Sequence, residues 1–512
     1  MKKICKKYIQ VVFLAAFLIV GCTDNFDKLN TNPVAYGSNN FNPNYLLTTS
    51  QLTYTGSTDF SYETWRSNLI YCSTMMQQFS TTLGYWAGDK YTLNAAYATA
   101  YWDVAYPEQV KPVVDLVEFT RAKAQYKNLH QIGRIMKAMI LQRITDLYGD
   151  VPYFEAGMGY YSKAYFPKYD NQEAIYMDIL KELEEATNSL DPAADKPTGD
   201  AFYNGDILKW QRFGNTLILR AAMRLTKAKP DLAKTYVQKV LGKTMQSNSD
   251  NAFLVNNAAG GRATINRNSQ VLNGPPENVE IKWSQTFINH LKNTNDPRLS
   301  VISVRNGNNN VPASQIGMPN GYDVGTIRNI STAPQYPGDR LSYSGPSAIF
   351  RNNDGPTFIL TYAESELLLA DAAVRFGIGG SAGDHYKNGV RAAITFLSQY
   401  NASAAISETV ANDFLTANSY DPANALSQIN TQYWINAATM LDFYESWSNW
   451  RRTGIPALVP TNYPANVTGN TIPRRFPYPV REANTNPVNY KPAHDAVPGG
   501  DLLSGRVWWD TQ

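Results

Sequence analysis

Several pairs of carboxylates in this chain have a spacing that would suit acid–base catalysis. Asp103 lies close to Glu108 along the sequence, and Asp146 lies close to Asp150. Two facing carboxylates are what glycoside hydrolysis requires, one as the acid and one as the base or nucleophile. A chain with 43 acidic residues contains many such pairs by chance, however. We expect the acids of "TDLYGD" (145–150) to cap and brace a helix turn rather than to cleave a glycan.

No other residue types form a catalytic signature. The four histidines, His130, His290, His385 and His494, are scattered, and the sequence contains no HExxH, CxxC, Walker A or GxGxxG motif. The adjacent arginines of "WRRTG" (450–454) could clamp an anion, but at a helix end they are expected to bind carbonyls and acids. The sequence therefore predicts a protein that is not an enzyme and needs no cofactor, with a structural calcium ion left open.

Aromatic residues in polar loops are the most informative feature. The stretch "TTLGYWAGDKYTLN" (81–94) places Tyr85, Trp86 and Tyr91 around two glycines. A tryptophan in such a loop is not easily buried completely, and sugar rings stack their C–H faces on aromatic planes. The other candidates for ligand contact are Trp283, Tyr322, Tyr336 and Tyr343. The alternative, that these rings pin the loops to the protein body, stays open.

Segments with helical periodicity are expected to form the body that positions these loops. Apolar residues recur at intervals of three and four in 129–147, and Gly149 ends that pattern. Asp170 and Glu173 have the spacing of a capping box before the next helix, which Pro192 ends. Further helices are expected at 207–225, after Pro230, at 357–376, near 384–400 and at 431–450. The remaining tryptophans lie in such periods and are assigned to the core: Trp65, Trp102, Trp210, Trp434, Trp447 and Trp450.

Two segments interrupt the helical pattern. Residues 243–280 and 300–356 are rich in Asn, Gly, Ser and Pro, and loops of this length inside a domain are usually functional. The last sixty residues carry many prolines and are expected to wrap the surface. These patterns predict a mostly α-helical protein in which one large domain, residues 43–512, has a loop-rich and irregular ligand-binding face.

The N-terminus indicates where the protein works. Four lysines precede a short apolar run that ends at Gly21, which is the pattern of a signal peptide over residues 1–21. "IVGC" (19–22) is similar to a bacterial lipobox, so we expect Cys22 to carry the lipid and residues 22–42 to form a flexible tether. Ordinary signal cleavage beside an incidental cysteine is the alternative.

Composition excludes several classes of protein. Cleavage after Gly21 removes four lysines and no acid, which changes the net charge from +3 to −1. No basic stripe suggests nucleic-acid binding. Only Cys72 would remain besides the lipidated cysteine, so no disulfide can form within the mature chain, and Cys72 is expected to be a buried apolar residue.

Eight segments in a fixed order resemble the SusD/RagB family of bacterial surface lipoproteins. They are "ITDLYGDVPYFEA" (144–156), "FPKYDNQEAIY" (166–176), "GDILKWQRFGNTLILRAAMRL" (205–225), "NDPRLS" (295–300), "ILTYAESELLLADAAVRFG" (359–377), "WRRTGIPALVP" (450–460), "IPRRFPYPVREANTN" (472–486) and "VWWD" (507–510). Any one of them is weak, but the ordered set covers nearly the whole mature chain. One departure is Asp371, at which relatives commonly have Glu; this change is expected to matter little to the fold.

The resemblance implies a fold, a location and a partner. It implies tetratricopeptide-like helix pairs that form an α-solenoid core, with irregular excursions that hold the ligand. It also implies a lipid anchor in the outer membrane, facing the cell exterior, and a SusC-like TonB-dependent barrel over which the protein sits as a lid. The family shares no motif for ligand residues, so none is transferred to this sequence.

The expected function is nutrient binding at the cell surface. The protein would capture oligosaccharides, with oligopeptides as the second ligand class, and pass them to the transporter. A lipid-anchored glycan hydrolase and a surface adhesin or scaffold are the alternatives from other classes. The sequence does not identify the glycan.

Overall fold

The computed structural model describes residues 41–325 and 328–511. Residues Asn44–Gln512 form one compact unit. The predicted signal peptide, Cys22 and nearly all of the predicted tether lie outside the described residues. Within the described part of the chain, no helix is both long enough and apolar enough to cross a bilayer.

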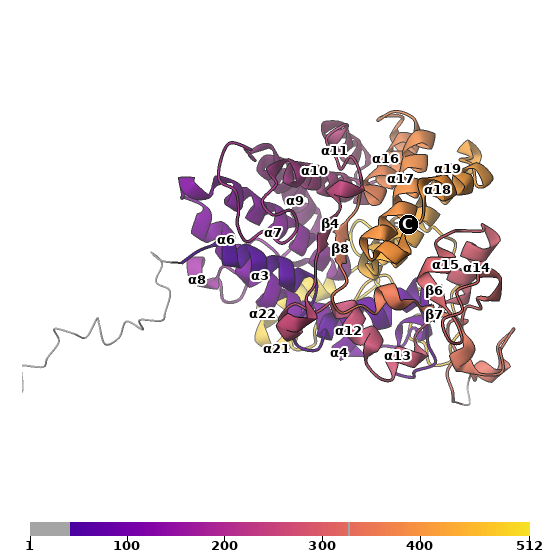
Figure 1. Cartoon of the computed structure of the whole chain (residues 1–512). Coiled ribbons are helices and arrows are strands. Elements are labelled where there is room, and N and C mark those ends of the chain that lie inside the picture. Colours follow the sequence, from indigo (N-terminus) through magenta and orange to yellow (C-terminus); the bar gives the residue numbers. More distant parts are fainter. Residues whose placement is uncertain (1–40, 326–327, 512) are drawn as a thin grey trace, which may run out of the picture. The chain divides into compact units, whose positions relative to one another are not determined.

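The first half of the unit is built from long helices that pack in sequence order. They are α3 (Asn44–Tyr54), α6 (Lys111–Thr120), α7 (Lys127–Tyr148), α9 (Gln172–Asn188), α10 (Ile207–Arg224) and α11 (Pro230–Val240). Helix α6 packs on α7, α7 on α9, α9 on α10, and α10 on α11. Figure 1 shows this group in indigo and purple, with the helices lying side by side.

The second group of helices continues the same pairing. It consists of α16 (Tyr362–Phe376), α17 (Ala382–Thr395), α18 (Glu408–Ala417), α19 (Ala425–Met440) and α20 (Phe443–Thr453). Helix α16 packs on both α17 and α19, while α19 packs on α20. Helix α10 also contacts α16 and thereby joins the two groups. We call these two groups together the helical body.

Local sequence explains the main helices. The predicted stripe of α7 is confirmed, because its apolar residues from Leu129 to Leu147 are fully buried. The predicted cap of α9 is wrong by one residue: Asn171, not Asp170, accepts the hydrogen bond from the Glu173 amide. The Asp170 side chain instead accepts from the amides of Tyr153 and Phe154, since β3 holds it beside that turn.

The helix predicted over 431–450 is two helices. Leu441 adopts a left-handed conformation (φ 59°) that ends α19, and the Asp442 side chain caps the first turn of α20. Helix α20 then ends at Gly454, which has a positive φ of 74°. The break turns the chain, so that α20 packs back on α19.

Short elements carry the segments between the long helices. The short helices are α4 (Ala95–Ala98), α5 (Ala100–Val104), α8 (Gly159–Ser162), α12 (Arg267–Asn273), α13 (Glu277–Glu280), α14 (Gln285–Asn293), α15 (Leu299–Ile302), α21 (Glu482–Thr485) and α22 (Pro487–Asp495), together with the π-helical segment Thr64–Ser73. The strands form four antiparallel pairs: β1 (Phe79–Ser80) with β5 (Lys282–Trp283), β2 (Val151–Pro152) with β3 (Tyr169–Asp170), β4 (Ala252–Leu254) with β8 (Thr357–Leu360), and β6 (Ser303–Val304) with β7 (Gly345–Pro346).

Buried ion pairs link the two helix groups. Arg220 and Arg224 of α10 are almost fully buried, and they bind Glu364 of α16 and Glu445 of α20 respectively. The Tyr433 hydroxyl lies 2.8 Å from Glu364 Oε1 and 2.7 Å from Glu445 Oε1, so its one proton can be donated to either carboxylate. Burial works to raise the pKa of Glu445, but Arg224 and Arg220 overcome this effect and lower it to about 2. Each buried charge here therefore has an opposite charge in contact.

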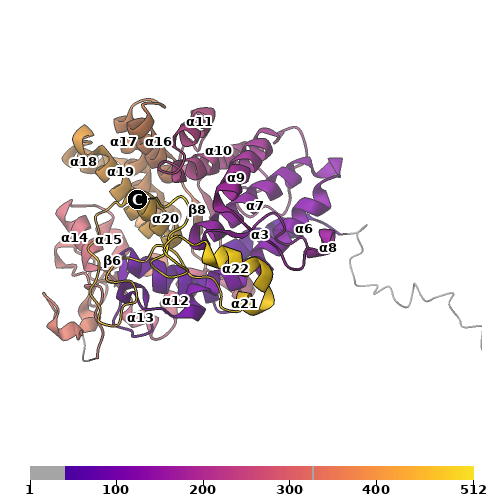
Figure 2. The ribbon, with the colours of Figure 1, turned by 180° about the vertical axis from the view of Figure 1, so that it is seen from behind.

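The C-terminal segment is fastened to the body by Trp509. Its indole Nε1 donates to the Asp146 carboxylate at 2.9 Å, and the ring is fully buried. The Tyr176 hydroxyl and the Arg224 guanidinium bind the same carboxylate. Figure 2 shows the segment, in yellow, running across this side of the unit to α21 and α22. The neighbouring Trp508 is only partly buried and packs against the edge of the core.

Candidate functional site

Four partly exposed aromatic rings and one arginine gather near the start of the π-helical segment. We call Tyr62, Trp65, Tyr85, Tyr97 and Arg66 the aromatic cluster. The rings of Trp65 and Tyr85 meet edge to face, with centroids 6.3 Å apart. The Arg66 guanidinium lies 3.8 Å from the Tyr62 ring centroid, 5.0 Å from that of Trp65 and 5.3 Å from that of Tyr97. The cluster thus offers aromatic edges and faces beside a cation.

A single buried carboxylate orients two of these four rings. Glu277 of α13 accepts hydrogen bonds from Trp65 Nε1 at 2.9 Å and from the Tyr85 hydroxyl at 2.5 Å. Trp86 Nε1 donates to the same oxygen at 3.4 Å. Burial and the adjacent Glu277 raise the pKa of Tyr85, so this hydroxyl remains a donor at neutral pH. Fixed rings lose little conformational entropy when a ligand stacks on them.

Three of the predicted ligand residues are buried in the protein body. The expectation that Trp86 is open to solvent is wrong, because its side chain has no exposed surface. The loop folds tightly onto the body here: a Cβ on Gly88 would lie 2.5 Å from the Tyr71 carbonyl oxygen. Tyr91 is equally buried, and the Thr461 amide donates to its hydroxyl at 3.1 Å. Trp283 lies in β5, where its indole donates to the Ile302 carbonyl.

The three predicted tyrosines of the 300–356 segment build a small separate core. Tyr343 is buried with Met318, Ile330 and Ala333, and the partly buried rings of Tyr322 and Tyr336 pack against that group. The Arg328 guanidinium covers the Tyr322 ring at 4.4 Å. These rings stabilise the segment, and of the seven predicted residues only Tyr85, Tyr322 and Tyr336 keep exposed surface.

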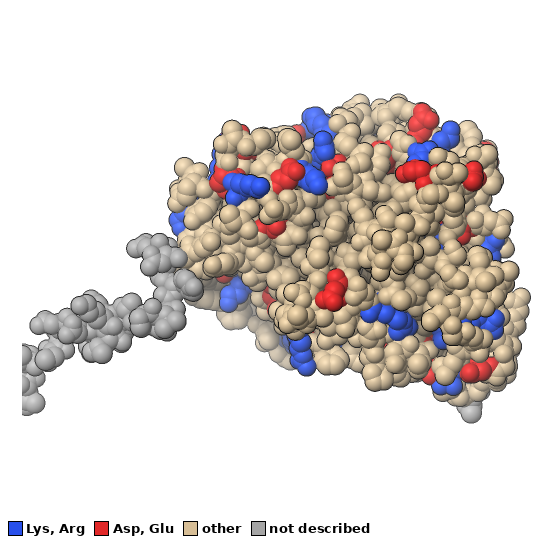
Figure 3. Space-filling view, viewed as in Figure 1, with Lys and Arg blue, Asp and Glu red and all other residues tan. Residues whose placement is uncertain are grey.

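An open groove of about 480 Å³ lies beside this small core. We call it the basic groove; its polar and charged lining residues are Asn273, Asn278, Lys282, Arg305, Asn306, Asn308, Tyr343 and Arg351. No Asp or Glu is among the residues that line it. Helix α13 connects the two features, because Glu277 anchors the aromatic cluster while Asn278 and Val279 line the groove. On the side of the molecule drawn in Figure 3, charged residues of both signs lie in small scattered groups.

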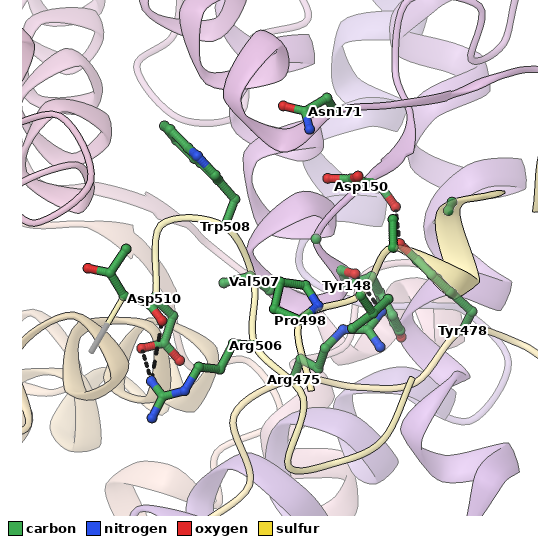
Figure 4. A pocket seen from close by; sticks show the side chains of 15 residues that line it. Tyr148, Asp150, Asn171, Arg475, Tyr478, Pro498, Arg506, Val507, Trp508 and Asp510 are labelled. Atoms are coloured by element: carbon green, nitrogen blue, oxygen red, sulfur yellow. Dashed lines mark hydrogen bonds and ion pairs between the residues drawn. The ribbon is translucent and has the colours of Figure 1, made fainter. Parts of the chain in front are cut away.

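A second cavity, of about 340 Å³, lies under the C-terminal segment. Trp508, Asn171 and Asp150 surround one part of it, and the buried Arg475 and Tyr478 line another part (Figure 4). Burial raises the pKa of Asp150, whose carboxylate accepts from the Gln172 amide. None of its lining residues belongs to the aromatic cluster or to the basic groove.

The residue pairs that could have been catalytic are engaged in structural contacts. Asp146 is buried in the ion-pair network, and Asp103 pairs with Arg481 at 2.8 Å. Arg451 donates to the carbonyls of Asp146 and Arg474, while Arg452 binds the buried Asp371 carboxylate, as expected for arginines at a helix end. Among the described residues, no three His, Cys, Asp or Glu side chains gather as metal ligands would.

Sequence reasoning missed the two residues on which the aromatic cluster depends. Trp65 was assigned to the core with the other helical tryptophans; Trp102, Trp210, Trp434, Trp447 and Trp450 are indeed buried, but Trp65 is partly exposed. The signal was present, because Tyr62, Trp65 and Arg66 have the i, i+3, i+4 spacing of one helix face. No local pattern marked Glu277.

Cys72 is buried as predicted, and burial raises the pKa of its thiol.

Known proteins resemble this chain over most of its length. A family model described as "Starch-binding associating with outer membrane", of the SusD-like type, matches residues 40–479. A solved chitin-binding protein is 32% identical over 92% of this chain and 100% of its own, with a TM-score of 0.81. A SusD-like protein of Bacteroidetes AC2a is 25% identical over the same shares, with a TM-score of 0.79.

A chitin-binding SusD homologue from Flavobacterium johnsoniae shares the fold at 22% identity, with a TM-score of 0.74 over 92% of this chain and 98% of its own. No curated protein matches the chain. The likeness to these solved structures confirms the predicted fold of mostly paired helices.

Proposed function

Because the chain belongs to the SusD-like family of outer-membrane nutrient-binding proteins, we propose that it captures oligosaccharides on its aromatic cluster and passes them to an outer-membrane transporter. The family consists of non-catalytic binding proteins, which confirms the prediction that the protein is not an enzyme. It also removes the glycan-hydrolase alternative.

The aromatic cluster is the observation that carries this proposal. Trp65 and Tyr85 keep exposed surface although they are large and partly apolar, and Glu277 holds both rings in place. A sugar ring can lay its C–H face on such a ring while its hydroxyls bind nearby donors and acceptors. Arg66 lies within reach of three of the four rings and supplies donors.

The relatives indicate which sugars to test first. One similar structure is named as a chitin-binding protein, and the family model is described as starch-binding. Chitin oligosaccharides and malto-oligosaccharides are therefore the first neutral probes. Oligopeptides remain the second ligand class, and a peptide pool provides the comparison.

Calorimetric titration of the Trp65→Ala variant tests the aromatic cluster. Loss of the stacking surface should weaken glycan binding by about 1–2 kcal/mol, roughly tenfold, with little change in the melting temperature. Trp508→Ala is the matched control, because that ring is also partly exposed but lies on the C-terminal cavity. Equal glycan affinity in the wild type and in Trp65→Ala would contradict the proposed site.

The anchor and the partner form a separate part of the proposal. Cleavage after residue 21 and lipidation of Cys22 would attach the domain of residues 43–512 through the 22–42 tether, facing the cell exterior. Cys22→Ala should then abolish surface labelling of intact cells, because each lipid chain contributes about 0.8 kcal/mol per buried methylene. Affinity purification from mildly solubilised membranes should recover a SusC-like TonB-dependent barrel. Recovery of the protein alone would favour the adhesin or scaffold alternative.

A further inference from the structure

The basic groove contains three cations that have no acidic partner. Lys282, Arg305 and Arg351 form no ion pair with any described residue, in contrast to the arginines of α10. Lys282 Nζ donates to the Leu341 carbonyl at 2.7 Å, and Arg305 Nη1 donates to the Ser314 carbonyl at 3.0 Å. Arg351 Nε donates to the Pro346 carbonyl at 3.3 Å. Carbonyl groups satisfy these donors but do not neutralise their charge.

The acids closest to the groove are already engaged. Glu280 binds Arg340 at 2.6 Å and also accepts from the Thr82 hydroxyl, while Asp339 accepts from the Leu341 amide. Lys282 itself is 7% exposed. Burial lowers its pKa to about 8, against the smaller opposing effect of Glu280. An uncompensated charge in such a place is costly unless an anion joins it.

The geometry of the groove points to an anionic ligand: we propose that it binds a negatively charged substituent, a carboxylate or a sulfate ester, of the captured oligosaccharide. This inference rests on the proposed function and narrows its ligand class. Arg305 and Arg351 each keep Nη2 free of hydrogen bonds to described residues, so each can donate to an anion.

The remaining lining suits the rest of a sugar. Four exposed asparagines surround the three cations, and amide groups both donate to and accept from hydroxyls. Asn306 and Asn308 lie on a hairpin turn that the paired backbone hydrogen bonds between Arg305 and Asn309 close. Helix α13 contributes to both features, since Glu277 binds Trp65 and Tyr85 while the next residue, Asn278, lines the groove.

Matched glycan pairs test the proposal. The purified protein is titrated with an oligogalacturonate and with the same oligosaccharide after its carboxylates are reduced to alcohols. A sulfated chondroitin oligosaccharide and its desulfated form distinguish the second source of charge. We expect at least one charged probe to bind about tenfold more tightly than its neutral counterpart, and this advantage to shrink in high salt.

Variants locate the effect. Arg305→Gln should remove most of the preference for the charged probe, about tenfold, while changing affinity for the neutral counterpart less than about twofold. Lys181→Gln, which removes an exposed lysine of α9, is the control and should change neither. Melting temperatures show whether both variants are folded. If Arg305→Gln does not fold, Lys282→Gln replaces it in the same titrations.

Two results would overturn the inference: no preference for either charged probe, or the same preference in wild type and both groove variants. The proposed function fails differently, through equal glycan affinity in the wild type and in Trp65→Ala. If the protein binds neutral glycans through Trp65 and shows no preference for charged probes, the proposed function stands and the anion-binding role of the groove is refuted.

Discussion

In the helical body, Arg224 is buried against Glu445 and Asp146, whereas in the basic groove Lys282 and Arg305 bind only backbone carbonyls. In the helical body, acidic side chains of the same chain neutralise the charge of Arg224. In the basic groove, no acidic side chain among the described residues neutralises Lys282 or Arg305, so their charge is available to a ligand. Since burying a charge without a partner is costly, the difference distinguishes charges that the chain compensates itself from charges that a ligand can still reach, because Lys282 and Arg305 line an open groove. The tryptophans show a similar contrast. Most of them are buried in the protein core, whereas Trp65 of the aromatic cluster is partly exposed.

The largest effect is expected from breaking the body's ion-pair network. Arg224→Met removes the cation that lies closest to the buried Glu445 and Asp146 carboxylates, so the free energy of unfolding should fall by about 3–5 kcal/mol. Lys239→Met is the control, because its pair with Glu184 is partly exposed to solvent and should contribute less than about 1 kcal/mol. Urea titration measures both. Equal losses would show that burial does not distinguish these pairs.

The C-terminal tryptophans test the same contrast between neighbours. Trp509→Ala removes a fully buried ring and its bond to Asp146, and should cost about 3–5 kcal/mol of stability. Trp508→Ala removes a partly exposed ring and should cost less than about 1 kcal/mol. Thermal melts that rank the two variants the other way would contradict the observed burial.

Glu63 provides a buried carboxylate without a paired cation. Burial raises its pKa to about 7, its Oε1 accepts from the Ser57 amide, and its Oε2 has no partner among the described residues. The folded state therefore holds a proton that the unfolded state loses near the ordinary value of 4.5. The contribution of Glu63 to stability should fall as pH rises from about 4.5 to about 7, by on the order of 3 kcal/mol.

Glu63→Gln should make that slope smaller, because the glutamine side chain does not titrate. Glu173→Gln changes an exposed carboxylate that pairs with Lys229, and it should leave the slope as in the wild type. Urea titrations at several pH values give the comparison. The same pH dependence of stability in Glu63→Gln and in the wild type would refute the raised pKa of Glu63.

The smallest effect is expected in the aromatic cluster itself. Tyr85→Phe keeps the ring but removes the hydroxyl that donates to Glu277, so stability should fall by about 1 kcal/mol. Glycan affinity should fall roughly two- to threefold, since the ring is less firmly held. Tyr322→Phe is the control from the separate small core. A tenfold loss in Tyr85→Phe would indicate that the hydroxyl contacts the ligand directly.

Local patterns were sufficient for most of the helices. The stripe of α7 and the glycine that ends it act over a few residues, so the sequence predicts them well. The break at Leu441 was not predicted, because a left-handed leucine has no local signature and depends on how α19 and α20 pack. The order of the eight family segments predicted the paired-helix fold, which the solved relatives confirm.

The candidate site was predicted in part. Tyr85 is partly exposed, but Trp86 beside it is buried, and Trp65, which was assigned to the core, is partly exposed. Polar surroundings in sequence do not determine exposure, because the loop 81–94 folds against segments far along the chain, including Glu277 and Thr461.

The sequence by itself determined the helical class, the family and the residue types available for recognition. Only the tertiary structure decided which of them meet: Lys282, Arg305 and Arg351 are separated in sequence and line one groove. Periodicity and capping reflect interactions between near neighbours, which the sequence displays directly. Exposure and charge pairing depend on contacts between distant segments, and these exist only once the whole chain has packed.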